Sequence, residues 1–133
     1  MKLQGRSIFS GQVSGLALVS PANISFYGGV DPATGVIVEP GHPLEGQSIA
    51  GRILVFPTGK GSTVGSYTLY RLKRSSLAPL AVINAECETI TAVGCIIAEI
   101  PCLDQVDLSQ IHTGDQLTLN AGEGWVEISQ KTA

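Results

Sequence analysis

The sequence predicts a β-rich α/β fold, in which a body of strands encloses a small segment of alternating strands and helices. Sixteen glycines and seven prolines are spread along the chain as turn positions. Short apolar runs of strand length dominate the first half and the end of the chain, and strand-like and helix-like segments alternate between them. The 133 residues contain no repeat, linker or low-complexity tract, so they predict one domain spanning residues 1–133.

The first half of the chain is predicted to be mostly strand. Residues 15–19 form an apolar run that ends before Pro21, which is typical of a buried strand. A long glycine-containing turn at residues 28–35 is followed by a strand-like segment at 36–38 and a loop at 39–43. Loops of this length in a small domain are often functional.

The middle of the chain predicts strand, helix, strand, helix. The apolar run at residues 52–56 precedes a helix at 62–74, with Ser62 as a favourable N-cap and basic residues in its last turn. Residues 79–84 follow as a second buried strand, and residues 89–98 as a helix whose small residues allow close packing.

The end of the chain returns to strands. Residues 100–103 predict a short third strand of the α/β segment. Residues 114–119 and 125–128 predict a hairpin whose turn is residues 120–124.

Composition limits the possible partners. The chain is 44% hydrophobic and only 14% charged, which indicates that a partner covers some apolar surface. A net charge of −3, without a basic stripe interleaved with aromatics, argues against nucleic acid. No apolar run approaches the roughly 18 residues of a membrane span, and the first six residues lack the apolar core of a signal peptide. We therefore expect a cytoplasmic protein without membrane contact.

The cysteines and histidines predict no metal site. Cys87, Cys95 and Cys102 are odd in number and too far apart for a Cys-x-x-Cys clip, so we expect buried small hydrophobic residues. His42 and His112 lie in predicted loops without a pattern typical of a catalytic triad. The carboxylates are scattered along the chain, and we expect no metal bound by this chain alone.

The loop at residues 57–62 is the strongest candidate for chemistry. It joins the predicted strand at 52–56 to the predicted helix, and it brings the Ser62 hydroxyl, the Lys60 ammonium and glycine-rich backbone together. Unpaired N–H groups and the positive end of the helix dipole favour a developing negative charge there. The loop is not a nucleotide-binding P-loop, because Leu54 occupies the place of that motif's first glycine. From the residues alone, Ser62 is also explained as an ordinary N-cap.

Several stretches, in their order and spacing, resemble the small, swivelling subunit of the aconitase X family. The longest are residues 25–35 (SFYGGVDPATG), 42–51 (HPLEGQSIAG) and 59–62 (GKGS). Shorter matches at residues 78–79, 82–84 and 100–101 extend the resemblance over most of the chain.

The resemblance implies a swivelling β/β/α domain with a β-barrel-like body, which caps a separate large subunit. That partner would hold an iron–sulfur cluster, or iron, and most of the substrate pocket. The active site would lie between the two subunits and remove water from a small hydroxy acid.

Two substrates fit the resemblance. Residues 64–67 and 78–84 look more like the branch that converts mevalonate 5-phosphate to trans-anhydromevalonate 5-phosphate in isoprenoid biosynthesis. Dehydration of cis-3-hydroxy-L-proline is the alternative within the family. A non-catalytic binding or regulatory module is an alternative of another class, because fold does not fix function.

The resemblance also implies roles for residues. Ser62 would act as an alkoxide-like general base, and Lys60 would help to hold its charge or the substrate carboxylate. Further candidates for substrate binding or for the oxyanion are Gly59, Gly61, Thr63, Gly29 and Asp31. Gly29 and Asp31 are equally well explained as residues that shape a turn.

Overall fold

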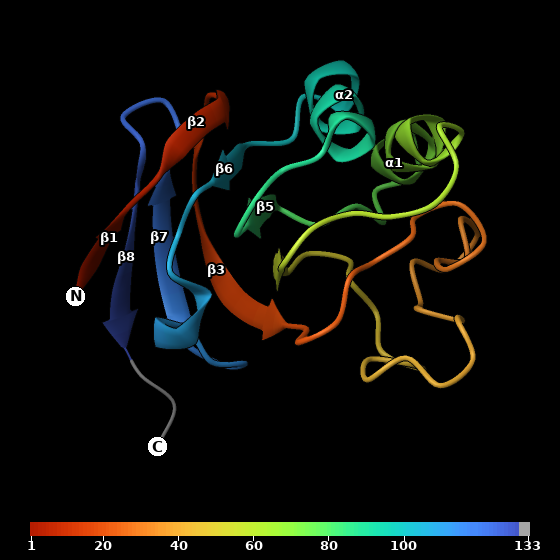
Figure 1. Ribbon diagram of the computed structural model, residues 1–133, viewed down its shortest axis with the longest axis horizontal. Helices are drawn as coiled ribbons and strands as arrows, with labels where there is room; N and C mark the ends of the chain where they lie inside the picture. Colours follow the sequence, from red (N-terminus) through yellow and green to blue (C-terminus); the bar gives the residue numbers. More distant parts are fainter. Residues whose placement is uncertain (131–133) are drawn as a thin grey trace.

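The computed structural model describes residues 1–130, in which one eight-stranded mixed sheet is combined with two α-helices (Figure 1). This confirms the predicted fold class; residues 131–133, the end of the predicted domain, lie outside the described residues. In chain order the elements are β1 (Lys2–Gln4), β2 (Arg6–Phe9), β3 (Gln12–Val19), β4 (Ile53–Phe56), α1 (Gly65–Arg74), β5 (Ala81–Asn84), α2 (Thr89–Ala98), β6 (Cys102–Asp104), the 3-10 helix η1 (Leu108–Gln110), β7 (Gln116–Asn120) and β8 (Trp125–Gln130).

The sheet curls until its two ends meet at Gly5. Its strand order is β1-β8-β7-β3-β4-β5-β6-β2, and the strands at the two ends, β1 and β2, are separated in the chain only by this glycine. The Gly5 N–H donates to the Gly124 carbonyl oxygen over 2.8 Å. A Cβ on Gly5 would lie 2.6 Å from the Asp104 carbonyl oxygen, so a side chain has no room there. The result is a β-barrel-like body.

Parallel strands form the part of the sheet that carries the helices. β3, β4, β5 and β6 pair in parallel, whereas the remaining pairs are antiparallel. α1 follows β4 and α2 follows β5, and both helices lie on the same side of these strands (Figure 1). A strand covered on both faces needs apolar side chains on both. All four residues of β4 are accordingly buried, and they alternate between two cores.

One core lies under the helices and the other inside the barrel. The helix-side core includes Leu54, Phe56, Leu69, Leu72 and Cys95. The barrel core includes Ile53, Val55, Ile83, Leu117 and Val126.

The two helices approach each other closely at Gly94 of α2. A Cβ there would lie 2.6 Å from Leu69 Cδ1 of α1 and 3.2 Å from Ser66 Cα. The Ser66 hydroxyl donates to the Ile90 carbonyl oxygen over 2.7 Å and so joins the helices directly. The predicted close packing of the second helix is confirmed.

Most predicted elements are found. The strands expected at residues 15–19, 52–56, 79–84 and 100–103 correspond to β3, β4, β5 and β6, with ends shifted by up to three residues. The predicted helix at 89–98 is α2, and the predicted hairpin is β7 and β8.

The prediction that the first helix begins at Ser62 is wrong. α1 begins at Gly65, and its N-cap is Val64, which makes no side-chain capping bond. The Ser62 hydroxyl instead accepts the Val64 N–H over 3.1 Å, and the Gly65 N–H donates to the Ser62 carbonyl oxygen over 2.9 Å. Ser62 therefore belongs to a tight turn that precedes the helix, and its hydroxyl and carbonyl oxygens accept the hydrogen bonds that close this turn.

The prediction of a strand at residues 36–38 is also wrong. Val36 and Ile37 make only isolated bridges, to Ser48 and Val30 respectively. Turns before and after this segment prevent a longer ladder, and residues 20–52 form one long connection between β3 and β4.

This long connection is held by buried side chains. Phe26 packs edge-to-face on Phe56 of β4, with 5.9 Å between ring centroids. His42 is buried, and its Nδ1 accepts the Leu44 N–H while its Nε2 lies 3.0 Å from the Asn23 carbonyl oxygen. His42 is thus a structural residue that fixes the connection.

The cysteines are free thiols. Cys95 and Cys102 are buried in the helix-side core, as predicted, whereas Cys87 is half-buried. Cys87 Sγ lies 3.8 Å from Cys102 Sγ, and this hydrogen bond together with burial raises the pKa of the Cys87 thiol. Neither α-helix of residues 1–130 has the length and apolar character that crossing a membrane requires.

We expect replacement of Phe26 with Ala to lower the free energy of unfolding by about 3–5 kcal/mol, because it leaves a cavity against Phe56. Phe26→Leu should cost clearly less because it keeps most of the volume. Urea unfolding of both variants measures this. Equal, small losses would mean that the long connection is not anchored at Phe26.

Candidate functional site

The candidate loop leaves the sheet where two parallel strands end side by side. Pro57, directly after β4, accepts hydrogen bonds at its carbonyl oxygen from the N–H groups of Ala85 and Glu86, which follow β5. The side chain of Asn84 donates from Nδ2 to the Phe56 carbonyl oxygen over 3.0 Å. In parallel sheets, ligands bind at the carboxyl ends of the strands. The loop at residues 57–64 is therefore fixed at the edge where a site is expected.

Gly59 fits against the start of α2 because it has no side chain. Glu88 is the N-cap of α2, and its carboxylate accepts the N–H groups of Ile90 and Thr91, each over 2.7 Å. A Cβ on Gly59 would collide with Glu88 Oε1 and Thr91 Oγ1. The carboxylate of Glu88 thus complements the helix dipole and also sets the path of the loop.

Gly61 makes a second close contact, with Ser25. Its φ of +99° lies in the region that favours glycine, and a Cβ there would collide with Ser25 Oγ. The backbone around Ser25 is fixed beside the loop, because the Lys60 N–H donates to the Ile24 carbonyl oxygen over 3.0 Å. Sequence reasoning gave Ser25 little weight, since only the fold brings it to Gly61.

Three successive backbone N–H groups remain free beside Ser62. Within residues 1–130, the N–H groups of Gly61, Ser62 and Thr63 donate to no acceptor of the chain, and all three residues are exposed. The Ser62 hydroxyl accepts from Val64 but donates to no described group. Free N–H groups ahead of a helix N-terminus attract negative charge, so this turn can stabilise an oxyanion or hold a carboxylate.

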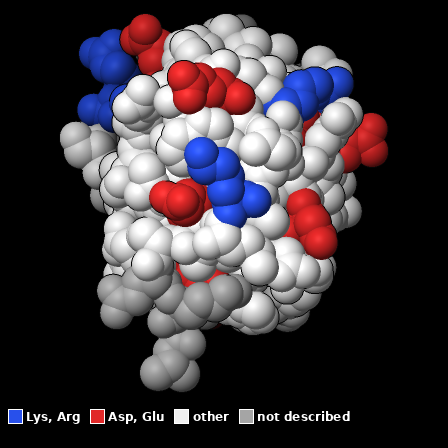
Figure 2. All heavy atoms as spheres, turned by 90° about the vertical axis from the view of Figure 1, so that its left-hand side faces the viewer, with Lys and Arg blue, Asp and Glu red and all other residues white. Residues whose placement is uncertain are grey.

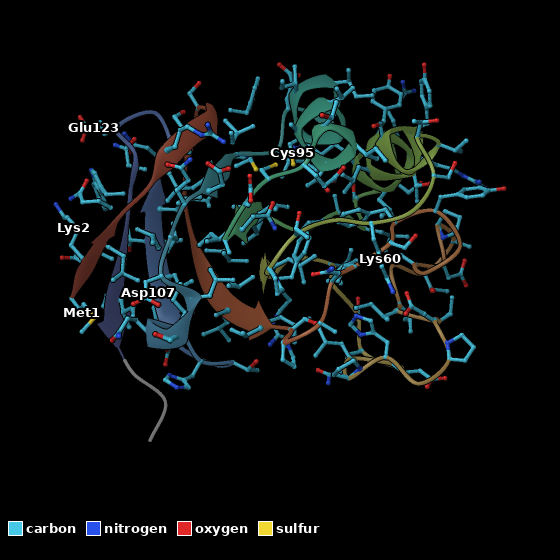
Figure 3. The ribbon with its side chains drawn as sticks, in the orientation of Figure 1. Met1, Lys2, Lys60, Cys95, Asp107 and Glu123 are labelled. Carbon is cyan, nitrogen blue, oxygen red and sulfur yellow. The ribbon has the colours of Figure 1, made fainter. Side chains whose placement is uncertain are left out.

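Lys60 has a partner that sequence reasoning missed. Its ammonium lies 2.9 Å from Glu39 Oε2, in the long connection between β3 and β4. The other carboxylate oxygen of Glu39 would be 3.4 Å from a Cβ on Gly29. The structure thus brings Lys60, Glu39 and Gly29 together, and Figure 3 shows Lys60 where the loop meets the long connection. No local pattern links Glu39 to a lysine 21 residues away.

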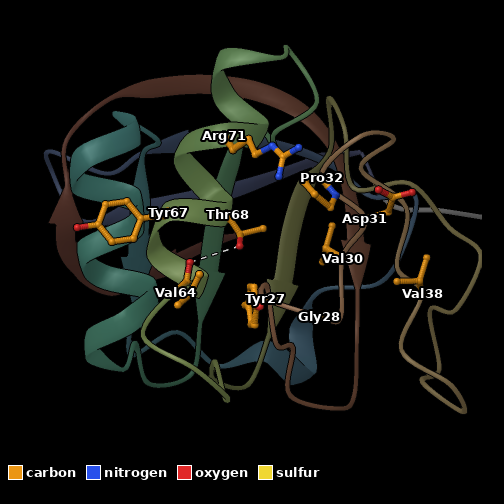
Figure 4. Close-up of a pocket in the computed structure, with 10 residues that line it drawn as sticks. All are labelled: Tyr27, Gly28, Val30, Asp31, Pro32, Val38, Val64, Tyr67, Thr68 and Arg71. Carbon is orange, nitrogen blue, oxygen red and sulfur yellow. Dashed lines mark hydrogen bonds between the residues drawn. The ribbon is translucent and has the colours of Figure 1, made fainter.

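Asp31 lies in the long connection between β3 and β4. Its Oδ1 accepts the Ala33 N–H, and its carbonyl oxygen accepts the Gly35 N–H, so it shapes a turn. It also lines a hollow of about 400 Å³ between this turn and α1, with Tyr67 and Arg71 on the helix (Figure 4). Lys60 and Ser62 are not among the residues around the hollow. Val64, whose N–H donates to the Ser62 hydroxyl, does line the hollow, so Asp31 shares it with the end of the loop and not with Ser62 itself.

The iron centre implied by the resemblance does not fit residues 1–130. No group of three or more His, Cys, Asp or Glu side chains in this part of the chain is placed to hold a metal ion. The thiols of Cys87 and Cys102 are 3.8 Å apart, but within residues 1–130 no third His, Cys, Asp or Glu side chain joins them in a metal-binding group.

Comparison with known proteins gives consistent results. The family model for the aconitase X swivel domain matches residues 2–128. The phosphomevalonate dehydratase small subunit of Thermococcus kodakarensis is 52% identical over 128 residues, which is 96% of each chain. The subunit of the same name from Methanosarcina acetivorans is 50% identical over 96% of this chain and 91% of its own length. The crystal structure of Thermococcus kodakaraensis aconitase X in its holo form matches with a TM-score of 0.96 at 51% identity, covering 98% of this chain and 99% of that one.

We expect Gly61→Ala to destabilise the chain more than Gly46→Ala. Both residues have positive φ, which costs an alanine about 1–2 kcal/mol, but a Cβ on Gly46 meets nothing within 4 Å. The clash with Ser25 should add about 1–3 kcal/mol. Urea unfolding measures both variants.

A double variant separates the two costs. Adding Ser25→Ala to Gly61→Ala removes the clashing hydroxyl and should recover part of the loss. Equal losses for Gly61→Ala and Gly46→Ala, with no recovery in the double variant, would contradict the close contact.

Proposed function

This chain belongs to the aconitase X swivel-domain family, and we therefore propose that it is the small subunit of a two-subunit phosphomevalonate dehydratase. This hydro-lyase converts mevalonate 5-phosphate to trans-anhydromevalonate 5-phosphate, a step of isoprenoid biosynthesis. The observation that carries the proposal is the Ser62 turn with its three free N–H groups. The chain that carries this turn is about 50% identical to proteins named as that small subunit, and the identity extends over nearly its whole length.

In the proposed mechanism, Ser62 is the general base. A C–H group beside a carboxylate is a very weak acid, and a neutral hydroxyl cannot remove its proton. The Val64 N–H, which donates to Ser62 Oγ over 3.1 Å, and the positive end of α1 favour an alkoxide at this oxygen, and the free N–H groups of the turn leave room for the substrate anion.

The elimination breaks a C–H bond and a C–O bond of the substrate and forms a C=C bond. Ser62 Oγ takes the proton, and the electron pair of the broken C–H bond forms the C=C bond. The hydroxyl on the next carbon leaves with its own bonding pair. The proton that Ser62 Oγ has taken is then passed on, directly or through solvent, so that the hydroxide is released as water and Ser62 is ready for the next cycle.

Lys60 would hold the substrate carboxylate or the alkoxide charge. Its ion pair with Glu39 uses one of the three N–H donors of the ammonium, which leaves two for an anion. The pair also holds the long lysine side chain beside the loop and so reduces the entropy lost on binding. Glu39 is a positioning residue in this proposal, and Gly29 gives its carboxylate room.

The large subunit completes the site in this proposal. Because residues 1–130 offer no metal-binding group, we assign the iron–sulfur cluster of the enzyme, and activation of the departing hydroxyl, to that subunit. The proposed location is the cytoplasm, with which the three free cysteines are consistent.

The experiment that tests the substrate uses the two subunits co-purified without oxygen. Dehydration of mevalonate 5-phosphate and of cis-3-hydroxy-L-proline is measured in parallel. Turnover of the first alone is expected. Turnover of the second would keep the mechanism but replace the pathway, and no turnover of either by an iron-containing complex would favour a non-catalytic binding module.

We expect Ser62→Ala to lower kcat by about 10³-fold or more, with the complex intact, because the proton acceptor is lost. Ser48→Ala is the matched control: the Ser48 hydroxyl also accepts a backbone N–H two residues later, from Ala50 over 3.2 Å. The two variants should melt at similar temperatures. If kcat survives Ser62→Ala as it survives Ser48→Ala, Ser62 is only a turn residue.

We expect Lys60→Gln to lower kcat/KM by about 10- to 100-fold, which corresponds to one lost hydrogen bond to a charged group. Glu39→Gln should have a smaller effect, because the ammonium remains but is less well positioned. Either variant should change the unfolding free energy by less than about 1 kcal/mol, since the pair is partly exposed. Unchanged kcat/KM in Lys60→Gln would remove this residue from the site.

A further inference from the structure

The outer side of α2 is unusually apolar for an exposed helix. Residues 89–98 contain no Asp, Glu, Lys or Arg, yet Val93, Ile96 and Ile97 are 42%, 47% and 40% exposed. A helix that is hydrophobic all round is normally buried. An exposed apolar patch of this kind is typical of an interaction surface.

Two of these exposed residues, Val93 and Ile97, border a groove between α1 and α2. The groove has a volume of about 270 Å³, and Thr63, Tyr67, Ile90, Val93 and Ile97 are among the residues that line it. Tyr67 is 69% exposed and also lines the hollow beside Asp31, so it forms a ridge between two concave regions. Figure 4 shows its ring projecting from α1 on the side of α2. Exposed tyrosines at such positions are frequent anchors of protein interfaces.

The opposite side of the molecule has a different character. Figure 2 shows positive and negative side chains interspersed over the face where β1 and β8 lie. Mixed charge of this kind is typical of a solvent-facing surface. An apolar partner surface thus fits the helices and does not fit this face.

We propose that the α1–α2 face, defined as Thr63, Tyr67, Ile90, Val93, Ile96 and Ile97, is the docking surface for the large subunit. The surface is continuous with the candidate site, because Thr63 borders the groove and also supplies one of the three free N–H groups beside Ser62. The inference rests on the proposed function. If the substrate pocket lies in the large subunit, that subunit must approach Ser62, and the apolar face next to it is covered by the same contact.

A second copy of this chain fits the face less well. An isologous contact would place identical α1–α2 faces against each other. The Ser62 turn adjoins this face, so both turns would be crowded by a surface that brings no substrate pocket. A larger partner with a concave apolar surface covers the groove and still leaves room for substrate.

The test places a charge on the face. Ile97→Glu is compared with Leu80→Glu, because Leu80 is 38% exposed and lines another hollow, which none of the six residues of the α1–α2 face borders. Affinity for the candidate large subunit is measured by calorimetry, and folding of the free chain by thermal melting. Ile97→Glu should raise Kd at least about 30-fold, as loss of an interface hot spot does, and Leu80→Glu should change it less than about twofold.

Tyr67→Ala provides a second variant that adds no charge. It should also raise Kd about 30-fold while the chain melts normally, and kcat at saturating large subunit should be retained because Ser62 is untouched. Wild-type affinity in both Ile97→Glu and Tyr67→Ala would overturn the docking surface. The proposal would also be overturned if the free wild-type chain formed dimers, and the two variants lost this dimerisation but still bound the large subunit as tightly as the wild type.

The wild-type arm separates the two proposals. If the wild-type chain binds the large subunit and the variants bind it equally well, only the proposed docking surface is contradicted. A wild-type chain that forms no complex contradicts the two-subunit function itself, and the docking surface with it.

Discussion

The contact between Gly59 and the Glu88 cap of α2 is the constraint on which the candidate site depends. Glu88 is fixed because both of its carboxylate oxygens accept N–H groups of α2, and the loop after β4 passes against it with no room for a side chain. Gly61 makes a similar close contact, because a side chain there would collide with Ser25 Oγ. Two close backbone contacts thus fix a turn in which the N–H groups of Gly61, Ser62 and Thr63 find no acceptor within residues 1–130. Fixed dipoles of this kind can stabilise charge without reorganising.

Much of this arrangement could be predicted from the sequence, and the failures have physical reasons. Strand β4 was predictable because a short apolar run between Gly51 and Pro57 is typical of a buried strand, and α2 because its ten small and apolar residues exceed the usual length of a strand. The start of α1 was misplaced because the turn after Ser62 is closed by 3-10-type bonds, from the Gly65 N–H to the Ser62 carbonyl oxygen and from the Ser66 N–H to the Thr63 carbonyl oxygen, and is not yet α-helical. The Lys60–Glu39 pair was missed because it depends on the path of the whole connection between β3 and β4.

The two sides of the molecule suggest a division of labour between the subunits. The closed sheet, joined at Gly5, supplies a rigid support, and the carboxyl ends of β4 and β5 present the Ser62 turn at its edge. Such a domain can bring a base and charge-stabilising N–H groups to a substrate held elsewhere. In the proposed enzyme half of the site lies on each subunit, so neither subunit alone would carry out the elimination.

Turnover of mevalonate 5-phosphate by each subunit alone and by increasing ratios of the two tests this account most directly. We expect no dehydration by this chain alone or by the large subunit alone. Activity should appear on mixing and reach its maximum at one small subunit for each large subunit. Full activity of the large subunit alone would contradict the account, because the proton acceptor could then not be Ser62 of this chain.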